Sequence, residues 1–164
     1  MSNKQKAIVI AVAAIAFLST WIATAPYPGN TGWERAPGVI IGGTLTPAPS
    51  DLTTLAEGTR TLKMKFVGFP PFVVNLNFGA TPDAIVTATR PDGGYWAQRV
   101  RDRGGDGWLR IGDQTYAMTA TEVLGEDRTP FLEIYSPRPG SLDRSSGPGL
   151  DPIRDWEVFL WTPR

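Results

Sequence analysis

The side chains best suited to bind an anionic ligand are arginines that gather in residues 99–110. Guanidinium groups can hold a phosphate through two parallel hydrogen bonds, so this run is a candidate phosphate-binding surface. The alternative is a solvated surface balanced by nearby acids, and charge runs of this kind are more often solvated than functional. The basic residues are Arg99, Arg101, Arg103 and Arg110, and the acids are Asp102, Asp106 and Asp113.

The chain of 164 residues contains neither histidine nor cysteine. The absence of histidine excludes Ser-His-Asp catalysis and His-ligated zinc, and the absence of cysteine excludes thiolate nucleophiles, Fe–S clusters and disulfides. Paired carboxylates could do acid–base work or bind calcium, but here they fall in predicted loops and turns, where solvated side chains are the expected role. We therefore predict no catalytic residue and no metal site. The carboxylates in question are Asp83, Asp92, Asp102 and Asp106.

The charge balance argues against one class of partner. Sixteen basic and sixteen acidic residues give a formal net charge of zero. Nucleic-acid-binding proteins normally carry a positive excess, because they must neutralise backbone phosphates. The sequence therefore predicts no nucleic-acid partner.

Residues 7–25 form an uncharged, mainly apolar run after a basic tail at residues 1–6 that carries Lys4 and Lys6. At about 1.5 Å per residue, the run is roughly 28 Å long, close to the thickness of a bilayer core. We predict a single transmembrane helix that contacts membrane lipid, with interfacial aromatics at Trp21, Tyr27 and Trp33. The positive-inside rule keeps the tail in the cytoplasm. In a bacterium, the remaining domain then lies in the periplasm at the inner membrane.

A cleaved signal peptide is the competing interpretation of the same run. Ala23, Thr24 and Ala25 have the small-x-small form of a cleavage site. Pro26 directly follows, and its fixed backbone should hinder processing. Both interpretations place the domain on the same side of the membrane.

The remaining sequence predicts a connector and a mainly β domain. Residues 26–50 are rich in Pro and Gly and predict an extended connector, with a short edge strand at 39–41. Residues 51–164 predict about six strands and one or two short helices, which is typical of a small antiparallel barrel. The predicted strands are 59–67, 72–78, 84–90 and 155–162, with a hairpin at 107–123 around a Gly-Asp turn and helices at 95–103 and 126–135.

Alternation within the strands predicts which residues face the core. Leu62, Met64 and Phe66 share one side of their strand. In the next strand, we expect Phe72, Val74, Leu76 and Phe78 to point inward and Val73, Asn75 and Asn77 to point outward. Thr129 is the expected cap of the helix at 126–135, with Pro130 at its first helical position.

The order of these signatures resembles a known superfamily. The segments in question are GG-x-L-x-PAPSDL at 42–52, TATRPDGGYW at 87–96, DGWLRIG at 106–112 and the terminal WEVFLW. Together they resemble the split β-barrel superfamily of pyridoxamine-phosphate-oxidase-like flavin-binding proteins, and within it the deazaflavin-dependent nitroreductase-like branch. The resemblance implies a split β-barrel, often a homodimer, with FMN or a deazaflavin in a groove at the barrel edge.

The resemblance also implies positions for the cofactor. The matching positions are Thr87, Thr89 and Arg90, with Trp96 and Arg99 opposite. One departure is that the basic, Gly- and Ser-containing phosphate segment of that branch has no counterpart at residues 63–70, which read KMKFVGFP.

Two functions follow as hypotheses from different classes. The first is a non-catalytic accessory subunit without a cofactor, anchored in a membrane and docked on other subunits of a respiratory or photosynthetic type of complex. Six Trp exceed what one small core needs, and exposed aromatics typically anchor protein–protein interfaces. The second is an FMN- or deazaflavin-dependent oxidoreductase with the cofactor at the positions named above.

Overall fold

The computed structural model describes residues 1–23, 38–89, 95–136 and 156–164, and for residues 21–23 it describes the backbone alone. The strands are β1 (Thr44–Leu45), β2 (Thr61–Phe66), β3 (Val73–Asn77), β4 (Gly79–Ala80), β5 (Ile85–Thr89), β6 (Asp106–Ile111), β7 (Gln114–Val123) and β8 (Glu157–Pro163). The helices are α1 (Asn3–Ala23), α2 (Tyr95–Arg103) and α3 (Thr129–Tyr135), with short 3-10 turns at η2 (Leu52–Ala56) and η3 (Gly125–Arg128).

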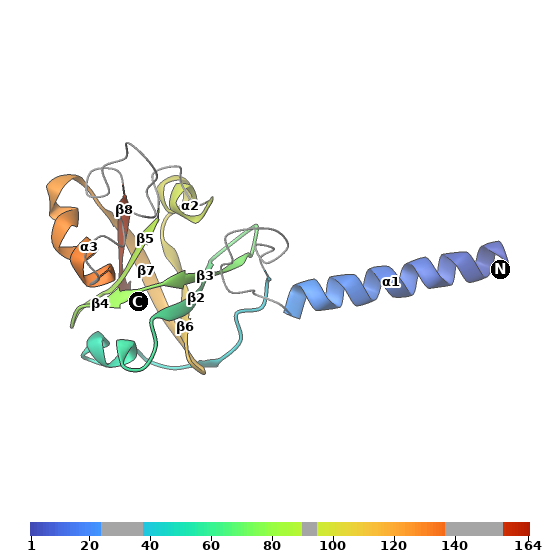
Figure 1. Cartoon of the computed structure of the whole chain (residues 1–164), viewed down its shortest axis with the longest axis horizontal. Helices are drawn as coiled ribbons and strands as arrows, with labels where there is room; N and C mark the ends of the chain where they lie inside the picture. Colours follow the sequence, from blue (N-terminus) through green and yellow to red (C-terminus); the bar gives the residue numbers. More distant parts are fainter. Residues whose placement is uncertain (24–37, 90–94, 137–155) are drawn as a thin grey trace.

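The strands form one sheet in the order β3-β2-β6-β7-β8-β5-β4, with β1 added in parallel beside β7. The sheet curves into an open half-barrel, and α1 extends away from it (Figure 1). All pairings along the main path are antiparallel. The prediction of a mainly antiparallel, barrel-like β domain with short helices is therefore confirmed.

The predicted hairpin at residues 107–123 is the pair β6 and β7. Ile111 faces Gln114 across a two-residue turn of Gly112 and Asp113. Gly112 adopts a positive φ of 59°, which a tight hairpin turn requires and glycine accepts without strain. The hairpin provides the central strands on which the rest of the sheet pairs.

The main core fills the concave side of the sheet. Leu62, Met64 and Phe66 are buried as the alternation predicted. Val74 also packs on this core, but Val73, which we expected to point outward, is 1% exposed. Gly38 forms an isolated bridge with Val73, whose N–H donates to the Gly38 carbonyl at 2.8 Å, so residue 38 lies beside β3 at this point.

A second, smaller core lies on the opposite face of β5 and β8, where α3 packs (Figure 1). Val86 and Val158 are fully buried there, against Leu132 of α3. A Cβ on Gly79 would come within 2.6 Å of the Ile134 carbonyl oxygen, so glycine permits the close approach of α3. These two strands are therefore covered on both faces.

The helices and the connector depart from the prediction in three details. α2 has the predicted bounds, whereas the helix expected at 126–135 is divided into η3 and α3. Thr129 is not its cap, because α3 begins after Arg128 without a side-chain cap, and Pro130 is therefore the second helical residue rather than the first. The edge strand expected at 39–41 is instead β1, because Thr44 and Leu45 are the residues that reach the backbone of β7.

Helix α1 carries apolar side chains on every side, and its described side chains are all exposed. Ile10 is 69% exposed and Ile15 is 64% exposed. The polar residues 3–6 form its first turn, so its apolar part is shorter than the helix. Among the residues that the structure describes, no helix meets both the length and the apolar character that a membrane crossing needs, in contrast to the transmembrane helix predicted at 7–25.

Candidate functional site

The threonines that the resemblance assigns to a cofactor phosphate lie on β5. Thr87 is fully buried, and its Oγ1 accepts a hydrogen bond of 3.0 Å from the indole Nε1 of Trp161. Thr89 is half-buried and lies opposite Glu157 on β8. Arg90, the third position, lies outside the described residues. The hydroxyl of Thr87 thus satisfies a buried donor of the core.

The two cofactor positions on α2 are also buried. Trp96 is 5% exposed and meets the ring of Phe159 edge-on, with centroids 4.8 Å apart. Arg99 is 6% exposed, and its Nη1 donates to the Phe69 carbonyl at 3.0 Å. Its Nη2 donates to the Val67 carbonyl. Arg99 therefore fastens the loop between β2 and β3 to α2.

Arg99 and Thr87 are connected through stacked rings of the core. The guanidinium carbon of Arg99 lies 5.8 Å from the ring centroid of Phe66. Phe66 stacks on Trp161 with centroids 5.2 Å apart, and Trp161 donates to Thr87. The structure thus brings Thr87, Trp96 and Arg99 into one packed cluster, whereas Thr89 is not part of it by any of these contacts. The cluster is continuous with the main core, and none of its members lines the two surface clefts described below.

The other arginines of the run are held by the protein itself. Arg101 forms a two-pronged pair with Glu122 and also contacts Glu157 at 2.8 Å. The hydrogen bonds that Arg101 donates to Glu122 are the main cause that raises the pKa of Arg101 further above its ordinary value. Arg103 Nη1 donates to the Phe69 carbonyl at 2.7 Å. Acids therefore balance only part of the run: Arg101 pairs with two glutamates and Arg110 with the predicted Asp113, whereas Arg99 and Arg103 donate to backbone carbonyls.

The outer face of the sheet carries an extended segment, residues 38–46, which crosses β6 and β7. Arg110 Nη1 donates to the Ile41 carbonyl at 3.1 Å, and Thr115 Oγ1 donates to the Gly42 carbonyl at 2.7 Å. Gly43 has a positive φ of 80°, and a Cβ there would lie 2.5 Å from Thr115 Oγ1. The paired glycines therefore let the segment lie directly on the sheet.

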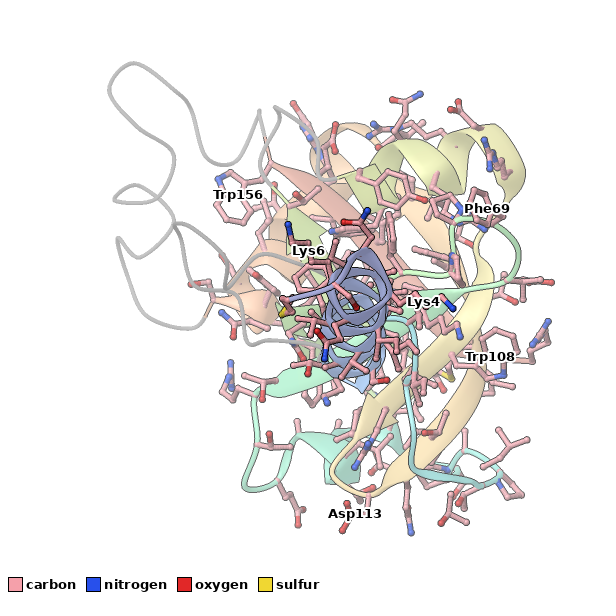
Figure 2. All side chains as sticks on the ribbon, turned by 90° about the vertical axis from the view of Figure 1, so that its right-hand side faces the viewer. Lys4, Lys6, Phe69, Trp108, Asp113 and Trp156 are labelled. Carbon is pink, nitrogen blue, oxygen red and sulfur yellow. The ribbon has the colours of Figure 1, made fainter. Side chains whose placement is uncertain are left out.

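This arrangement leaves two clefts on the outer face. One has a volume of about 340 Å³ and lies over β2, β3 and β6. It is lined by Thr59, Thr61, Leu62, Lys63, Asn75, Arg110 and Gly112. The other has a volume of about 350 Å³ and is lined by Ile41, Gly42, Gly43, Leu45, Lys65, Trp108 and Thr115. Figure 2 shows Trp108 on the side of the domain, between Phe69 at one end and Asp113 at the other.

The predicted membrane-interface aromatics are only partly described. Trp21 lies on the last turns of α1, and Tyr27 and Trp33 lie outside the described residues. Among the described residues, the exposed aromatics are Phe17 of α1 at 58%, Phe69 at 80% and Tyr95 at 48%. No cluster of His, Cys, Asp or Glu able to hold a metal ion occurs within the described part of the chain.

Comparison with known proteins gives little guidance. No protein-family model matches the chain. A segment of 58 residues is 38% identical to 2-aminomuconic semialdehyde dehydrogenase of Danio rerio. This match covers 34% of the chain and 12% of that protein, so it does not place the chain in that protein's family.

The sequence alone did not point to the two outer clefts. Lys63 and Lys65 were expected to face outward, and they do. Residues 38–46 lie over β6 and β7 and line only the cleft that contains Lys65, whereas strands β2, β3 and β6 and the loops beside them line the cleft that contains Lys63. The Gly42-Gly43 pair was the one sequence signal of such a close approach.

Proposed function

We propose that this protein is a non-catalytic accessory subunit, with a split β-barrel that α1 anchors to a membrane. The observation that carries the proposal is the apolar surface of α1. Ile8, Ile10 and Ile15 are each more than three-fifths exposed, at 62%, 69% and 64%. A surface helix of a soluble domain usually has one apolar stripe, whereas a helix that is apolar all round belongs in an apolar environment. The proposal places the half-barrel in the periplasm.

The roles of the predicted cofactor residues support the non-catalytic part of the proposal. Thr87 accepts from a buried indole, Trp96 packs edge-on against a ring, and Arg99 holds loop carbonyls. A cofactor phosphate at these positions would have to displace contacts that hold the core together. Absorption spectroscopy of the purified full chain tests this point. A stoichiometric flavin or deazaflavin band would favour the oxidoreductase alternative and contradict our proposal.

The exposed aromatic side chain of Phe69 supports docking on a partner. Phe69 is 80% exposed, yet its carbonyl is held by both Arg99 and Arg103. An exposed aromatic on a fixed loop loses little conformational freedom on binding, as anchors of interfaces do. Phe69→Ala should therefore reduce co-purification of partner subunits, whereas Leu124→Ala, at a residue 71% exposed on another loop, should leave it unchanged. Equal effects of the two changes would contradict docking through this loop.

Membrane attachment is tested on the full chain by fractionation and extraction with alkaline carbonate. We expect the wild type to stay in the membrane pellet and Ile10→Asp/Ile15→Asp to move to the supernatant. Ile40→Asp is the matched control, because Ile40 is 56% exposed but lies outside α1. A wild type that remains soluble and monodisperse would refute membrane attachment.

The proposed orientation has a separate test. Because the chain has no cysteine, single cysteines can be introduced at the exposed residues Ser2 and Glu57. An impermeant maleimide added to intact cells with a permeabilised outer membrane should label Glu57→Cys and spare Ser2→Cys. The reverse pattern would overturn the periplasmic placement of the domain.

A further inference from the structure

The cleft over β2, β3 and β6 has a positively charged and hydrogen-bonding lining. Lys63 and Arg110 contribute the charges, Thr59 and Thr61 contribute hydroxyl groups, and Asn75 contributes an amide. Its volume of about 340 Å³ lies within the usual range of small-molecule sites, about 300–1,000 Å³. None of these residues takes part in the proposed membrane anchoring or partner docking.

Strand geometry places the cationic side chains together. Lys63 lies in register with Arg110 on β6 and with Asn75 on β3. Side chains directly opposite each other on neighbouring strands have Cβ atoms about 4.5–5.5 Å apart, and like charges at this spacing destabilise the sheet. An anion between Lys63 and Arg110 would remove that repulsion.

Lys63 is available to a ligand. Among the described residues, its ammonium group has neither a hydrogen bond nor an ion pair. Lys65 provides the contrast, because it lies on the same face of β2 and its Nζ donates to the Val39 carbonyl at 2.7 Å. Lys65 is thus already hydrogen-bonded within the fold, whereas Lys63, with the same charge on the same strand face, is not.

Arg110 is held in place mainly by neutral carbonyl groups, so its positive charge is only partly neutralised. Its Nε donates to the Gly112 carbonyl at 2.9 Å, and Nη1 donates to the Ile41 carbonyl. Nη2 contacts the carboxylate of Asp113 at 3.2 Å, but that side chain is fully exposed. Exposed ion pairs of this kind are weak, so Asp113 competes only modestly with a ligand for the guanidinium.

We propose that this cleft binds the phosphate group of a small organic phosphate. Phosphate accepts several hydrogen bonds at once, and the cleft is lined by the Lys63 ammonium, the Arg110 guanidinium and the Thr61 hydroxyl. Lys63 supplies the mobile charge, and Arg110 supplies the fixed one. The remaining volume and the apolar contact of Leu62 accommodate the organic part of the ligand. The site does not depend on whether α1 enters a membrane.

The test is a titration of the full chain, in a neutral detergent and at constant ionic strength. The probes are inorganic phosphate and glycerol 3-phosphate, and the readout is the shift of backbone amide resonances. We expect saturable shifts at Thr61 and Gly112 and a rise in melting temperature, because the anion stabilises the folded state that binds it. Shifts that do not saturate, or that occur elsewhere, overturn the proposal.

Matched variants separate a site from general electrostatics. Lys63→Met and Lys65→Met remove the same charge from the same strand face. We expect Lys63→Met to weaken glycerol 3-phosphate binding at least tenfold and Lys65→Met to change it less than twofold. Asp113→Asn should strengthen binding. Equal losses in the two lysine variants would refute the site. Unchanged amide shifts of Val86 and Val158, which lie in the second core, establish that each variant is folded, and Lys63→Gln is the substitute should Lys63→Met fail this check.

A phosphate group can come from a soluble metabolite or from a lipid headgroup, and a further arm distinguishes these sources. Nanodiscs with phosphatidic acid are compared with nanodiscs of phosphatidylcholine alone. If the chain binds nanodiscs with phosphatidic acid and Lys63→Met abolishes that binding, the ligand is a lipid headgroup. Equal behaviour of both nanodiscs, together with glycerol 3-phosphate binding, assigns it to a soluble phosphate. Loss of binding to every probe overturns the proposal.

Discussion

Replacing Thr87 by valine tests whether this hydroxyl belongs to the core or to a ligand site. The change keeps the shape of the side chain and removes the acceptor of the Trp161 indole N–H, which lies 3.0 Å away. Both residues are fully buried, so the indole donor is left without water or another acceptor. An unpaired buried donor costs about 1–3 kcal/mol, and the extra apolar methyl returns less than about 0.8 kcal/mol. We expect a loss of about 1–2 kcal/mol in the free energy of unfolding.

The assay is urea unfolding of the full chain, followed by circular dichroism. Thr121→Val is the control, because Thr121 lies on an exposed position of β7 and its change should stay within about 0.5 kcal/mol. A double-mutant cycle with Trp161→Phe should give a coupling energy of about 0.5–1.5 kcal/mol between the two residues. A Thr87→Val variant as stable as the wild type, or no coupling to Trp161, would refute a structural role for this hydroxyl.

Three further predictions concern other contacts of the half-barrel. Arg99→Lys should lower the free energy of unfolding by about 1–3 kcal/mol in urea titrations, because lysine cannot donate to both loop carbonyls at once; an unchanged midpoint would contradict this. Gly107→Ala should cost about 2 kcal/mol or more in the same assay, because its Cβ would lie 2.4 Å from the Lys65 carbonyl oxygen; a neutral result would show that β2 and β6 separate easily. Hydrogen bonds from the Thr53 side chain and backbone lower the pKa of the Asp51 carboxyl below 3.8. These hydrogen bonds therefore stabilise the folded state above pH 3.8, and the stabilisation disappears as the pH falls through the lowered pKa. Carboxyl NMR titration should show this shift, and Thr53→Ala should move the pKa back toward 3.8.

The strands of the half-barrel were predictable because their signal is local. Alternation in residues 61–66 assigned Leu62, Met64 and Phe66 to the core, and the Gly-Asp turn located the central hairpin. Each of these patterns involves residues a few positions apart, where the period of the strand fixes which face a side chain takes.

Features that depend on distant segments were not predictable in the same way. Val73, which alternation placed outside, is buried and pairs with Gly38 from another part of the chain. Burial of β5 on both faces requires α3, which alternation in β5 alone does not reveal. The role of Arg99 is decided by the carbonyl of Phe69, thirty residues away, and the role of Thr87 by Trp161, a separation of 74 residues. An arginine run and a strand threonine therefore have the same sequence signature whether they bind a ligand or hold the core.

Lys63 and Lys65 show the limit of sequence reasoning on the outer face. They have the same charge, lie on the same strand and point to the same side, so sequence spacing alone does not distinguish them as candidates for anion binding. The fold separates them because the extended segment 38–46 brings the Val39 carbonyl to Lys65, while Lys63 opens into a cleft opposite Arg110. If Lys63→Met and Lys65→Met had equal effects on phosphate binding, the position of that segment would be irrelevant to the chemistry of this face. A difference between them would mean that one backbone carbonyl decides which lysine is free to bind an anion.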